Sequence, residues 1–317
     1  MKLIIQIPCF NEAETLAISL AALPRKVEGF DTVEWLIIDD GSHDETVKVA
    51  KECGVDHVVQ HTGNKGLARA FMTGLEASLA YGADVIVNTD ADNQYNADDI
   101  PKLVQPIVEN RAEIVVGERP IKFIEHFSPV KKLLQKLGSW VVRVASKTSI
   151  PDAPSGFRAM SRSAAQRLMV FNDYTYTLET IIQAGQKNMV ITSVPIRING
   201  DLRPSRLVKS IPSYIQRSII TIIRIFVIYR PFRFFGSIGA ILFTAGFIIG
   251  LRYMFFYFDD KGEGHIQSLI LASVLLGMGF QTLLVAFVAD LLSANRKLME
   301  DVRFKLAKTD DDNRTNH

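Results

Sequence analysis

The sequence is poor in cysteine and nearly balanced in charge. Its two cysteines, Cys9 and Cys53, form no CxxC pair and no other metal-binding spacing, so we interpret them as free thiols in a reducing compartment. The net charge of +2 over 317 residues gives no general electrostatic reason to expect nucleic-acid binding. The first apolar run, from Leu3 to Ile7, is short and polar residues soon follow it, so we predict no signal peptide.

Two common phosphate-binding motifs are also absent from the sequence. No G-x-G-x-x-G and no G-x-x-x-x-G-K-[ST] follows any of the strands predicted below. The first motif holds the pyrophosphate in Rossmann dinucleotide enzymes, and the second cradles the phosphates in P-loop NTPases. Both classes of nucleotide-binding protein are therefore disfavoured.

Two long apolar runs stand near the carboxyl end of the chain. They extend over residues 232–258 and 266–292, and each exceeds the roughly 20 helical residues that cross a bilayer core. Glycines recur in both runs, as is common where membrane helices pack closely. We predict two transmembrane helices, with a pair of buried helices in a soluble protein as the alternative.

The charges around these runs predict their orientation. Basic residues flank the runs on the side away from the connecting loop, at Arg230, Arg233, Arg296 and Lys297. The loop itself, residues 259–265, is short and acidic. The positive-inside rule therefore places both flanks in the cytoplasm and the loop outside.

The segments that flank the two apolar runs differ from them in composition and in expected structure. Residues 206–231 mix basic and apolar residues at helical spacing, which predicts amphipathic helices on the cytoplasmic leaflet. A helix packed on the soluble domain is the alternative for this segment. Residues 296–317 are expected to form a cytoplasmic tail, whose polar end after Lys308 is expected to be disordered.

Residues 1–205 alternate short apolar runs with helical patterns. Strands are predicted at Lys2–Cys9, Glu34–Asp40, Asp56–His61, Asp84–Thr89 and Glu113–Gly117, and helices at Ala13–Leu23, Thr46–Cys53, Gly66–Tyr81 and Asp98–Asn110. Strand–helix alternation with nearly continuous apolar strands indicates an α/β domain built on a parallel sheet, with helices on both faces. Ligands of such folds bind beyond the carboxyl ends of the strands.

The most informative polar cluster at these strand ends is the D-A-D-N-Q motif at residues 90–94. Asp90 and Asp92 stand one residue apart where an apolar strand ends, and Mg²⁺ or Mn²⁺ is commonly held by such carboxylates together with substrate phosphates. A calcium loop of the EF-hand type is excluded, because its sixth position would be Tyr95 instead of glycine and its twelfth Pro101 instead of glutamate. The alternative is a solvated acidic turn that caps the next helix.

Six motifs along the chain resemble, in their order, the signatures of family 2 glycosyltransferases with the GT-A fold. They are I-P-C-F-N-E at 7–12, I-D-D-G-S-H-D at 38–44, N-K-G at 64–66, D-A-D at 90–92, D-A-P-S-G-F-R at 152–158 and R-P-S-R at 203–206. With the two apolar runs, the pattern is similar to the polyprenyl-phosphate glycosyltransferases, the branch that includes dolichol-phosphate mannose synthase. The resemblance covers almost the whole chain and implies a Rossmann-like nucleotide-diphospho-sugar transferase domain.

The resemblance also implies roles for individual residues. Contacts to the nucleotide sugar are expected from Pro8, Phe10, Asn11, Glu12, Asp39, Asp40 and Gly66. Binding of Mg²⁺ or Mn²⁺ is expected from Asp90, Asp92 and Gln94. Contacts to the acceptor phosphate are expected from Arg119, Lys131, Lys132, Ser155, Arg158, Arg203 and Arg206. Catalysis is expected to depend on Asp90, Asp92, Arg119 and Asp152.

Two of the acidic residues keep alternative roles. Asp152 either orients the substrate or an arginine, or acts as a general base. Glu179 stands where related enzymes with hydroxyl acceptors place a catalytic acid, and a structural role is at least as well supported. A lipid monophosphate is largely dianionic at neutral pH, so it needs cations to hold it more than it needs a base.

The activity implied by the resemblance is transfer of a sugar, with inversion, from a nucleotide sugar to a polyprenyl phosphate at the cytoplasmic leaflet. A UDP-sugar is the favoured donor, GDP-mannose stays open, and the lipid is either undecaprenyl or dolichyl phosphate. The family also implies a homo-oligomer, a dimer or a tetramer. The alternatives are a membrane glycosyltransferase with a hydroxyl acceptor and a non-enzymatic, membrane-anchored sensor of sugar nucleotides.

Overall fold

A computed structural model of the chain describes residues 1–120, 148–170, 176–200, 227–258 and 266–315, with isolated positions between 140 and 146 and between 216 and 224. The chain divides into two compact units. One comprises residues 1–218 with 303–317, and the other comprises residues 219–302.

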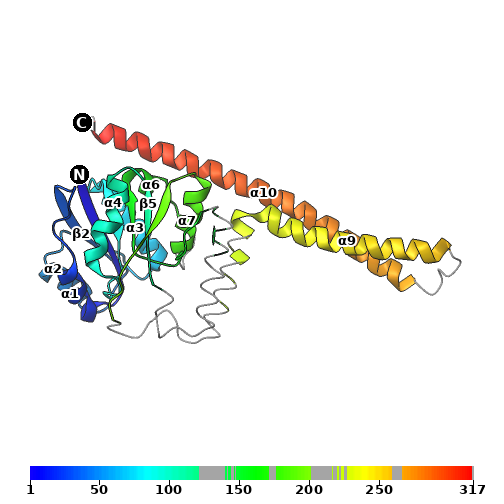
Figure 1. Ribbon diagram of the computed structural model, residues 1–317, viewed down its shortest axis with the longest axis horizontal. Helices are drawn as coiled ribbons and strands as arrows, with labels where there is room; N and C mark the ends of the chain where they lie inside the picture. The colour runs from blue at the N-terminus through cyan, green and yellow to red at the C-terminus, as the bar shows by residue number, and fades with distance from the viewer. Residues whose placement is uncertain are drawn as a thin grey trace. The chain divides into compact units, whose positions relative to one another are not determined.

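The first unit is built on a seven-stranded sheet (Figure 1). Its strands are β1 (Lys2–Cys9), β2 (Thr32–Asp39), β3 (His57–Gln60), β4 (Val85–Asn88), β5 (Ile114–Glu118), β6 (Arg158–Ser161) and β7 (Ile191–Pro195). Their order across the sheet is β3-β2-β1-β4-β6-β5-β7. The five strands predicted from the sequence are confirmed to within about two residues at each end, the usual uncertainty of such boundaries. Strands β6 and β7 were not predicted.

The sheet is mixed, so the expectation of a wholly parallel sheet is wrong. β1 to β4 pair in parallel, as do β5 and β7, but β6 runs antiparallel to both of its neighbours, β4 and β5. The chain leaves β5 at the carboxyl edge of the sheet and enters β6 at that same edge. A strand that begins at the edge where its neighbour ended must run in the opposite direction.

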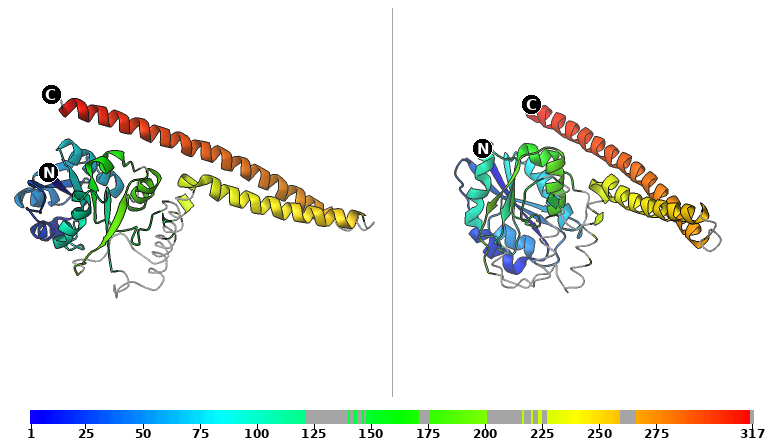
Figure 2. Two further views of the ribbon diagram at one scale, coloured as in Figure 1. Left: turned by 45° about the horizontal axis from the view of Figure 1, so that its top comes forward. Right: turned by 45° about the vertical axis from the view of Figure 1, so that its right-hand side comes forward.

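Helices cover both faces of this sheet, as predicted (Figure 2). They are α1 (Ala13–Ala22), α2 (Thr46–Glu52), α3 (Leu67–Ala80), the short η1 (Ala97–Asp99), α4 (Ile100–Val108), α6 (Arg162–Arg167) and α7 (Thr177–Gln186). Leucine and isoleucine side chains of α1 and α4 share one buried core with alternate residues of the strands, such as Ile5 and Ile37. On the opposite face, the side chain of Gln6 in β1 donates to the Phe71 carbonyl of α3 at 3.4 Å. Burial on both faces explains the nearly continuous apolar strands.

The second unit contains two long helices that lie side by side, α9 (Pro231–Phe258) and the first part of α10 (Ile266–Thr315). Both are long and apolar enough to cross a membrane, and few of the side chains in their apolar stretches are buried. Glycines permit the close approach of the two helices: a Cβ on Gly279 would lie 2.6 Å from the backbone nitrogen of Phe243, and one on Gly246 would lie 2.8 Å from that of Leu276. The two predicted apolar helices are thereby confirmed.

One expectation about the carboxyl end is wrong. The polar residues after Lys308 are helical, because α10 continues through them to Thr315. The sequence from 293 to 315 contains no glycine and no proline, and lysine, arginine, alanine, leucine and methionine recur in it up to Lys308. Residues of these types favour a helix, and nothing in the segment ends one. The predicted amphipathic segment 206–231 lies largely outside the described residues.

Candidate functional site

The ends of three neighbouring strands bring the predicted site residues to one edge of the sheet. β1 lies between β2 and β4 and runs parallel to both. The residues just beyond these strands therefore meet at the carboxyl edge, where α/β folds bind their ligands. They include Asn11 after β1, Asp40 after β2 and Asp90 after β4.

Asp40 clamps the loop that precedes α3. Its buried carboxylate accepts hydrogen bonds from the backbone N–H groups of Lys65 at 2.9 Å and Gly66 at 2.8 Å. It also lies 2.7 Å from Nδ1 of His61, whose Nε2 is 3.0 Å from the hydroxyl of Thr73. Asp40 is thus strongly engaged within the protein, and its effect on a nucleotide would be to place Gly66 at the site.

The carboxylate of Asp39 accepts weaker hydrogen bonds from the protein than that of Asp40, so it is better suited to bind a ligand. Its carboxylate is buried and accepts long hydrogen bonds, from the Ser42 N–H at 3.2 Å and from Gln60 Nε2 at 3.4 Å. A carboxylate has room for further N–H or hydroxyl donors, such as those of a nucleoside. The loop after β2 closes over Gly41, which has φ +75°, and a Cβ there would lie 2.6 Å from the backbone of Gly63. Only glycine fits that position.

The loop after β1 is tied to the loop after β2. The Asn11 N–H donates to the Ser42 hydroxyl at 2.8 Å, and its side-chain oxygen accepts from the His43 N–H at 2.8 Å. The Glu12 N–H donates to the Thr46 hydroxyl at 2.9 Å. Of the other predicted nucleotide contacts, Pro8 is buried within β1, and Phe10 at its end is exposed. Asn11 and Glu12 therefore shape the site, while Phe10 offers a ring at its surface.

Residues 90–96, which we name the metal loop, follow β4. Burial and the nearby charge of Asp92 raise the pKa of Asp90 to about 7, although Arg119 and Arg158 act in the opposite direction. A buried carboxylate beside a second one forms a donor set that suits a divalent cation, because the cation favours the charged form. The described residues contain no group of three acidic, histidine or cysteine side chains suited to a metal, and the amide of Gln94 stays a prediction as the third ligand.

The metal loop is sharply bent. Asp92 accepts a hydrogen bond from the Gln94 N–H at 3.1 Å, which closes a short turn around Asn93. Asn93 itself has φ +55°, in the left-handed region that asparagine tolerates better than most residues. The turn brings Asp92 and Gln94 to the same end of the loop.

Tyr95 links the metal loop to the segment before β6. Its hydroxyl accepts from the Gly156 N–H at 3.0 Å and bonds the carboxylate of Asp90. Gly156 packs so closely that a Cβ there would lie 3.2 Å from both oxygens of Asp90. Asn88 at the end of β4 completes the contact by donating to the Gly156 carbonyl at 3.0 Å. Tyr95 and Asn88 were not predicted as site residues, although both adjoin the acidic motif.

Arg119 and Asp152 form a buried, two-pronged ion pair. Arg119 follows β5, and its Nε and Nη2 atoms donate to the two oxygens of Asp152 at 2.7 and 2.9 Å. The Arg119 N–H also donates to Asp152 at 3.2 Å. The side chains are only 10% and 1% exposed. Asp152 therefore fixes the direction of the guanidinium, and the charge of Arg119 reaches Asp90, whose pKa it lowers against the larger effect of burial.

Ser155 and Arg158, both predicted to hold the acceptor phosphate, differ in what they offer. The guanidinium of Arg158 is fully buried and donates to the carbonyls of Ala153, Ser155 and Thr177 and to the hydroxyl of Thr180. These bonds tie the segment before β6 to α7, which is a structural task. The hydroxyl of Ser155 is buried and has no hydrogen-bond partner among the described residues, so it is the better candidate for a ligand contact.

Four of the predicted acceptor-phosphate residues lie outside the described residues: Lys131, Lys132, Arg203 and Arg206. Glu179 is buried in the first turn of α7.

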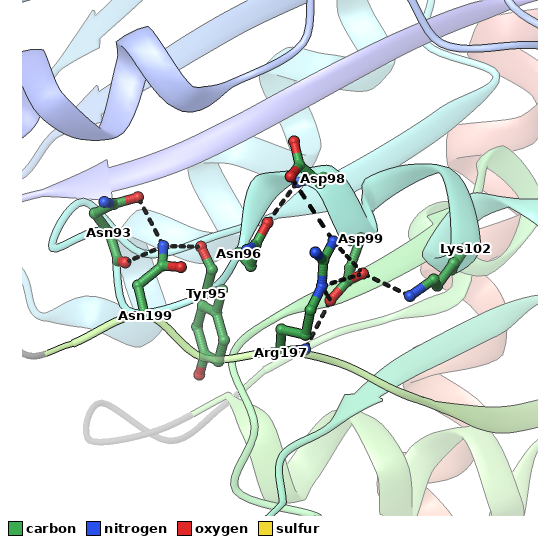
Figure 3. A network of polar contacts seen from close by, with 8 residues as sticks. All are labelled: Asn93, Tyr95, Asn96, Asp98, Asp99, Lys102, Arg197 and Asn199. Carbon is green, nitrogen blue, oxygen red and sulfur yellow. Dashed lines mark hydrogen bonds and ion pairs between the residues drawn. The ribbon is translucent and has the colours of Figure 1, made fainter.

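A segment after β7 holds the outer side of the metal loop (Figure 3). We name residues 196–199 the clasp. The Asn199 N–H donates to the Gln94 carbonyl at 2.8 Å, and its side-chain amide donates to the Asn93 carbonyl at 2.9 Å. Arg197 forms a second attachment with Asp99, which accepts from its backbone at 2.7 Å and from its guanidinium at 2.9 Å. No sequence pattern pointed to this clasp.

The Asp99–Arg197 pair predicts a pH-dependent contribution to stability. Burial alone would raise the pKa of Asp99, but hydrogen bonds from Arg197 and Lys102 lower it to about 2. The unfolded value is about 3.9, so this contribution is complete above about pH 4 and is lost as the pH falls towards the folded pKa. Arg197 and Lys102 are more than half exposed, and we therefore expect Asp99→Asn to cost only about 1 kcal/mol at neutral pH.

The measurement is urea unfolding of the full chain in detergent at several pH values. The difference between wild type and Asp99→Asn should shrink steadily below about pH 4. Asp98→Asn, in which the replaced side chain is 77% exposed, is the matched control and should change little. A difference that is the same at every pH would contradict the assignment.

Comparison with known proteins places this site in a family. Residues 4–169 match the sequence profile of Glycosyl transferase family 2. The UDP-N-acetylglucosamine–dolichyl-phosphate N-acetylglucosaminyltransferase of Methanococcus voltae is 32% identical over 213 residues, which is 60% of this chain and 83% of that protein. The undecaprenyl-phosphate mannosyltransferase of Micrococcus luteus is 26% identical over 207 residues, which is 62% of this chain and 83% of that one.

Solved structures share the fold of the sheet domain. Glucosyl-3-phosphoglycerate synthase from Mycobacterium tuberculosis, solved with Mn²⁺, UDP and glucosyl-3-phosphoglycerate, superposes with a TM-score of 0.54 at 19% identity, over 70% of this chain and 79% of that one. The chain belongs to glycosyl transferase family 2. Its sheet domain has the GT-A fold, as the sequence motifs implied.

Proposed function

We propose that this protein transfers a sugar from a nucleotide donor to a polyprenyl phosphate at a membrane surface. The observation that carries the proposal is the combination, in one chain, of a family 2 domain and two helices long and apolar enough to span a bilayer. A polyprenyl acceptor stays in the bilayer, so an enzyme that uses it gains from a membrane anchor. The names of the two relatives from Methanococcus voltae and Micrococcus luteus support an acceptor of this kind.

The donor would lie along the carboxyl edge of the sheet. Asp39 would accept hydrogen bonds from the nucleoside, with Phe10 and Gly66 beside it. A divalent cation held by Asp90, Asp92 and Gln94 would neutralise charge on the diphosphate as it leaves. Two observations favour a UDP-sugar as the donor: the name of the Methanococcus voltae relative and the UDP-bound structure of the same fold. The name of the Micrococcus luteus relative is the reason to test a mannose donor as well.

The acceptor phosphate would lie near Arg119 and Ser155. One of its oxygens would attack the anomeric carbon while the bond from that carbon to the nucleoside diphosphate breaks, which inverts the anomeric centre. The attacking oxygen carries no proton when the phosphate is dianionic, and no general base is then required. Arg119 would hold and orient the phosphate, and Asp152 would hold Arg119. We place this chemistry on the cytoplasmic side, because basic residues flank both helices.

A transfer assay tests the proposal directly. The full chain in detergent is given Mn²⁺ or Mg²⁺, radiolabelled UDP- and GDP-sugars, and either polyprenyl phosphate or the matching polyprenol without phosphate. We expect label in a lipid that mild acid releases, with one donor and only with the phosphorylated lipid. Label in a product from the hydroxyl lipid, or in none while a sugar nucleotide still binds, would overturn the acceptor assignment.

A further inference from the structure

One residue of the clasp, Asn199, makes three of the hydrogen bonds that hold the metal loop. Three consecutive carbonyls of the loop, those of Asn93, Gln94 and Tyr95, all accept hydrogen bonds from Asn199. The backbone N–H of Asn199 donates to the Gln94 carbonyl at 2.8 Å. Its side-chain amide donates to the Asn93 carbonyl at 2.9 Å and to the Tyr95 carbonyl at 3.3 Å (Figure 3). The same amide lies 3.3 Å from the side-chain oxygen of Asn93. Such a grip fixes the backbone of Gln94 from both sides.

The loop has reason to need this support. Asn93 adopts φ +55°, a conformation that costs most non-glycine residues about 1–2 kcal/mol when it stands alone. The turn that the Asp92 carboxylate makes with the Gln94 N–H covers only the inner side of the bend. The outer side carries three carbonyls in a row, and among the described residues Asn199 is the donor to all three. Asn199 therefore holds the bend at the point where Asp92 and Gln94 flank it.

The clasp itself is anchored away from the loop's tip. The Asn96 N–H donates to the Arg197 carbonyl at 3.2 Å, and Ile198 pairs with Tyr95 as an isolated β-bridge. Arg197 in turn is fixed on the buried carboxylate of Asp99, at the start of α4. The grip of Asn199 is thus built on a short two-stranded contact instead of a free loop. Its position relative to α4 is set by the core of the domain.

We propose that Asn199 is a positioning residue for the divalent-metal ligands, which keeps Asp92 and Gln94 in one arrangement by holding the carbonyls of residues 93–95. The proposal rests on the metal role given to this loop under the proposed function. Partners that orient metal ligands from outside typically matter about 10- to 100-fold in metal affinity. The nucleoside end of the site, at Asp39 and Phe10, has no contact with Asn199 among the described residues and should not depend on it.

The test measures binding of Mn²⁺ to the full chain in detergent. Free Mn²⁺ is followed by its electron paramagnetic resonance signal, with and without UDP, and UDP binding in the presence of EDTA is measured by calorimetry. We expect Asn199→Ala to weaken Mn²⁺ binding by about tenfold or more. Binding of UDP without metal should stay at the wild-type level. The concentration of Mn²⁺ that half-activates transfer should rise in parallel.

A matched control separates positioning from general loss of stability. Gln183 in α7 also uses its side-chain amide to clamp a backbone segment, since it donates to the Met169 carbonyl and accepts from the Met169 N–H at 3.0 Å. Gln183→Ala should lower the unfolding temperature and leave Mn²⁺ binding unchanged. Asn199→Asp provides a second variant of the same size, which loses the amide donor; it carries the test if the alanine variant fails to fold.

Two results would overturn the proposal. One is wild-type affinity for Mn²⁺ in both Asn199 variants. The other is a loss of metal-free UDP binding as large as the loss of Mn²⁺ binding. Failure of the proposed function is a separate result: a wild-type chain that binds Mn²⁺ and UDP but labels no lipid would refute the acceptor, and the binding measurements on Asn199 would still stand.

Discussion

An Asp92→Ala variant is expected to transfer sugar about two to three orders of magnitude more slowly than the wild type, and added Mn²⁺ should not restore the rate. Asp92 is half-buried in the metal loop, and its carboxylate raises the pKa of Asp90, second only to burial. Removing it takes away one of the two charges that favour a divalent cation. The pKa of Asp90 should fall in the variant, because a neighbouring charge of the same sign has gone.

The control for this variant comes from the same stretch of chain. Asp98 is also acidic but is 77% exposed, and Asp98→Ala should transfer sugar at the wild-type rate. Both proteins are assayed with saturating donor and acceptor over a range of Mn²⁺ concentrations, and circular dichroism confirms that each is folded. Wild-type turnover by Asp92→Ala at every Mn²⁺ concentration would contradict the metal role of the loop.

Much of the sheet domain could be predicted because short-range sequence patterns are enough to locate most of its strands. Four of the five predicted strands are apolar runs that are largely buried, and helical patterns separate the five strands, so alternation alone located them to within about two residues. β6 escaped prediction because it is only Arg158–Ser161 and begins with a charged residue. That arginine is buried, and its hydrogen-bond partners include Thr177 and Thr180, which lie 19 and 22 residues further along the chain, so no local pattern encodes its burial. β7 is a short strand whose residues are only partly buried.

The candidate site also contains residues that the sequence could locate and contacts that it could not. Asp39, Asp40 and Asp90 could be found because they stand at or just beyond the ends of strands, and strand ends meet at one edge of an α/β sheet. Which of them is available to a ligand depends on partners from other elements. Asp40 is taken up by a histidine and two backbone amides from the loop before α3, whereas Asp39 is not. The hydrogen bonds from Asn199 to the metal loop could not be predicted either, because they join residues more than a hundred positions apart in the sequence.

The second large effect is expected at Asp152. Asp152→Ala leaves the guanidinium of Arg119 buried without its partner, and we expect a loss of about 3–5 kcal/mol in stability together with the activity. Asp152→Asn is the informative variant, since it keeps an oxygen that can accept one bond from Arg119 but cannot act as a base. It should fold, bind the nucleotide sugar normally, and need more polyprenyl phosphate to reach half its maximal rate.

The pH profile decides between the two roles of Asp152. If Asp152 only holds Arg119, the chemistry still uses a phosphate that has lost its own proton. The rate of Asp152→Asn should then rise and level off with pH as the wild type does, at a lower plateau or a higher KM for the lipid. If Asp152 acts as a general base, the pH profile should differ. The acidic limb of the wild-type profile would then be absent in Asp152→Asn, and the rate would increase with hydroxide concentration. Arg119→Lys serves as the companion variant, because lysine keeps the charge but cannot make the two-pronged bond to Asp152, and it should raise the KM for the phosphorylated lipid in the same way.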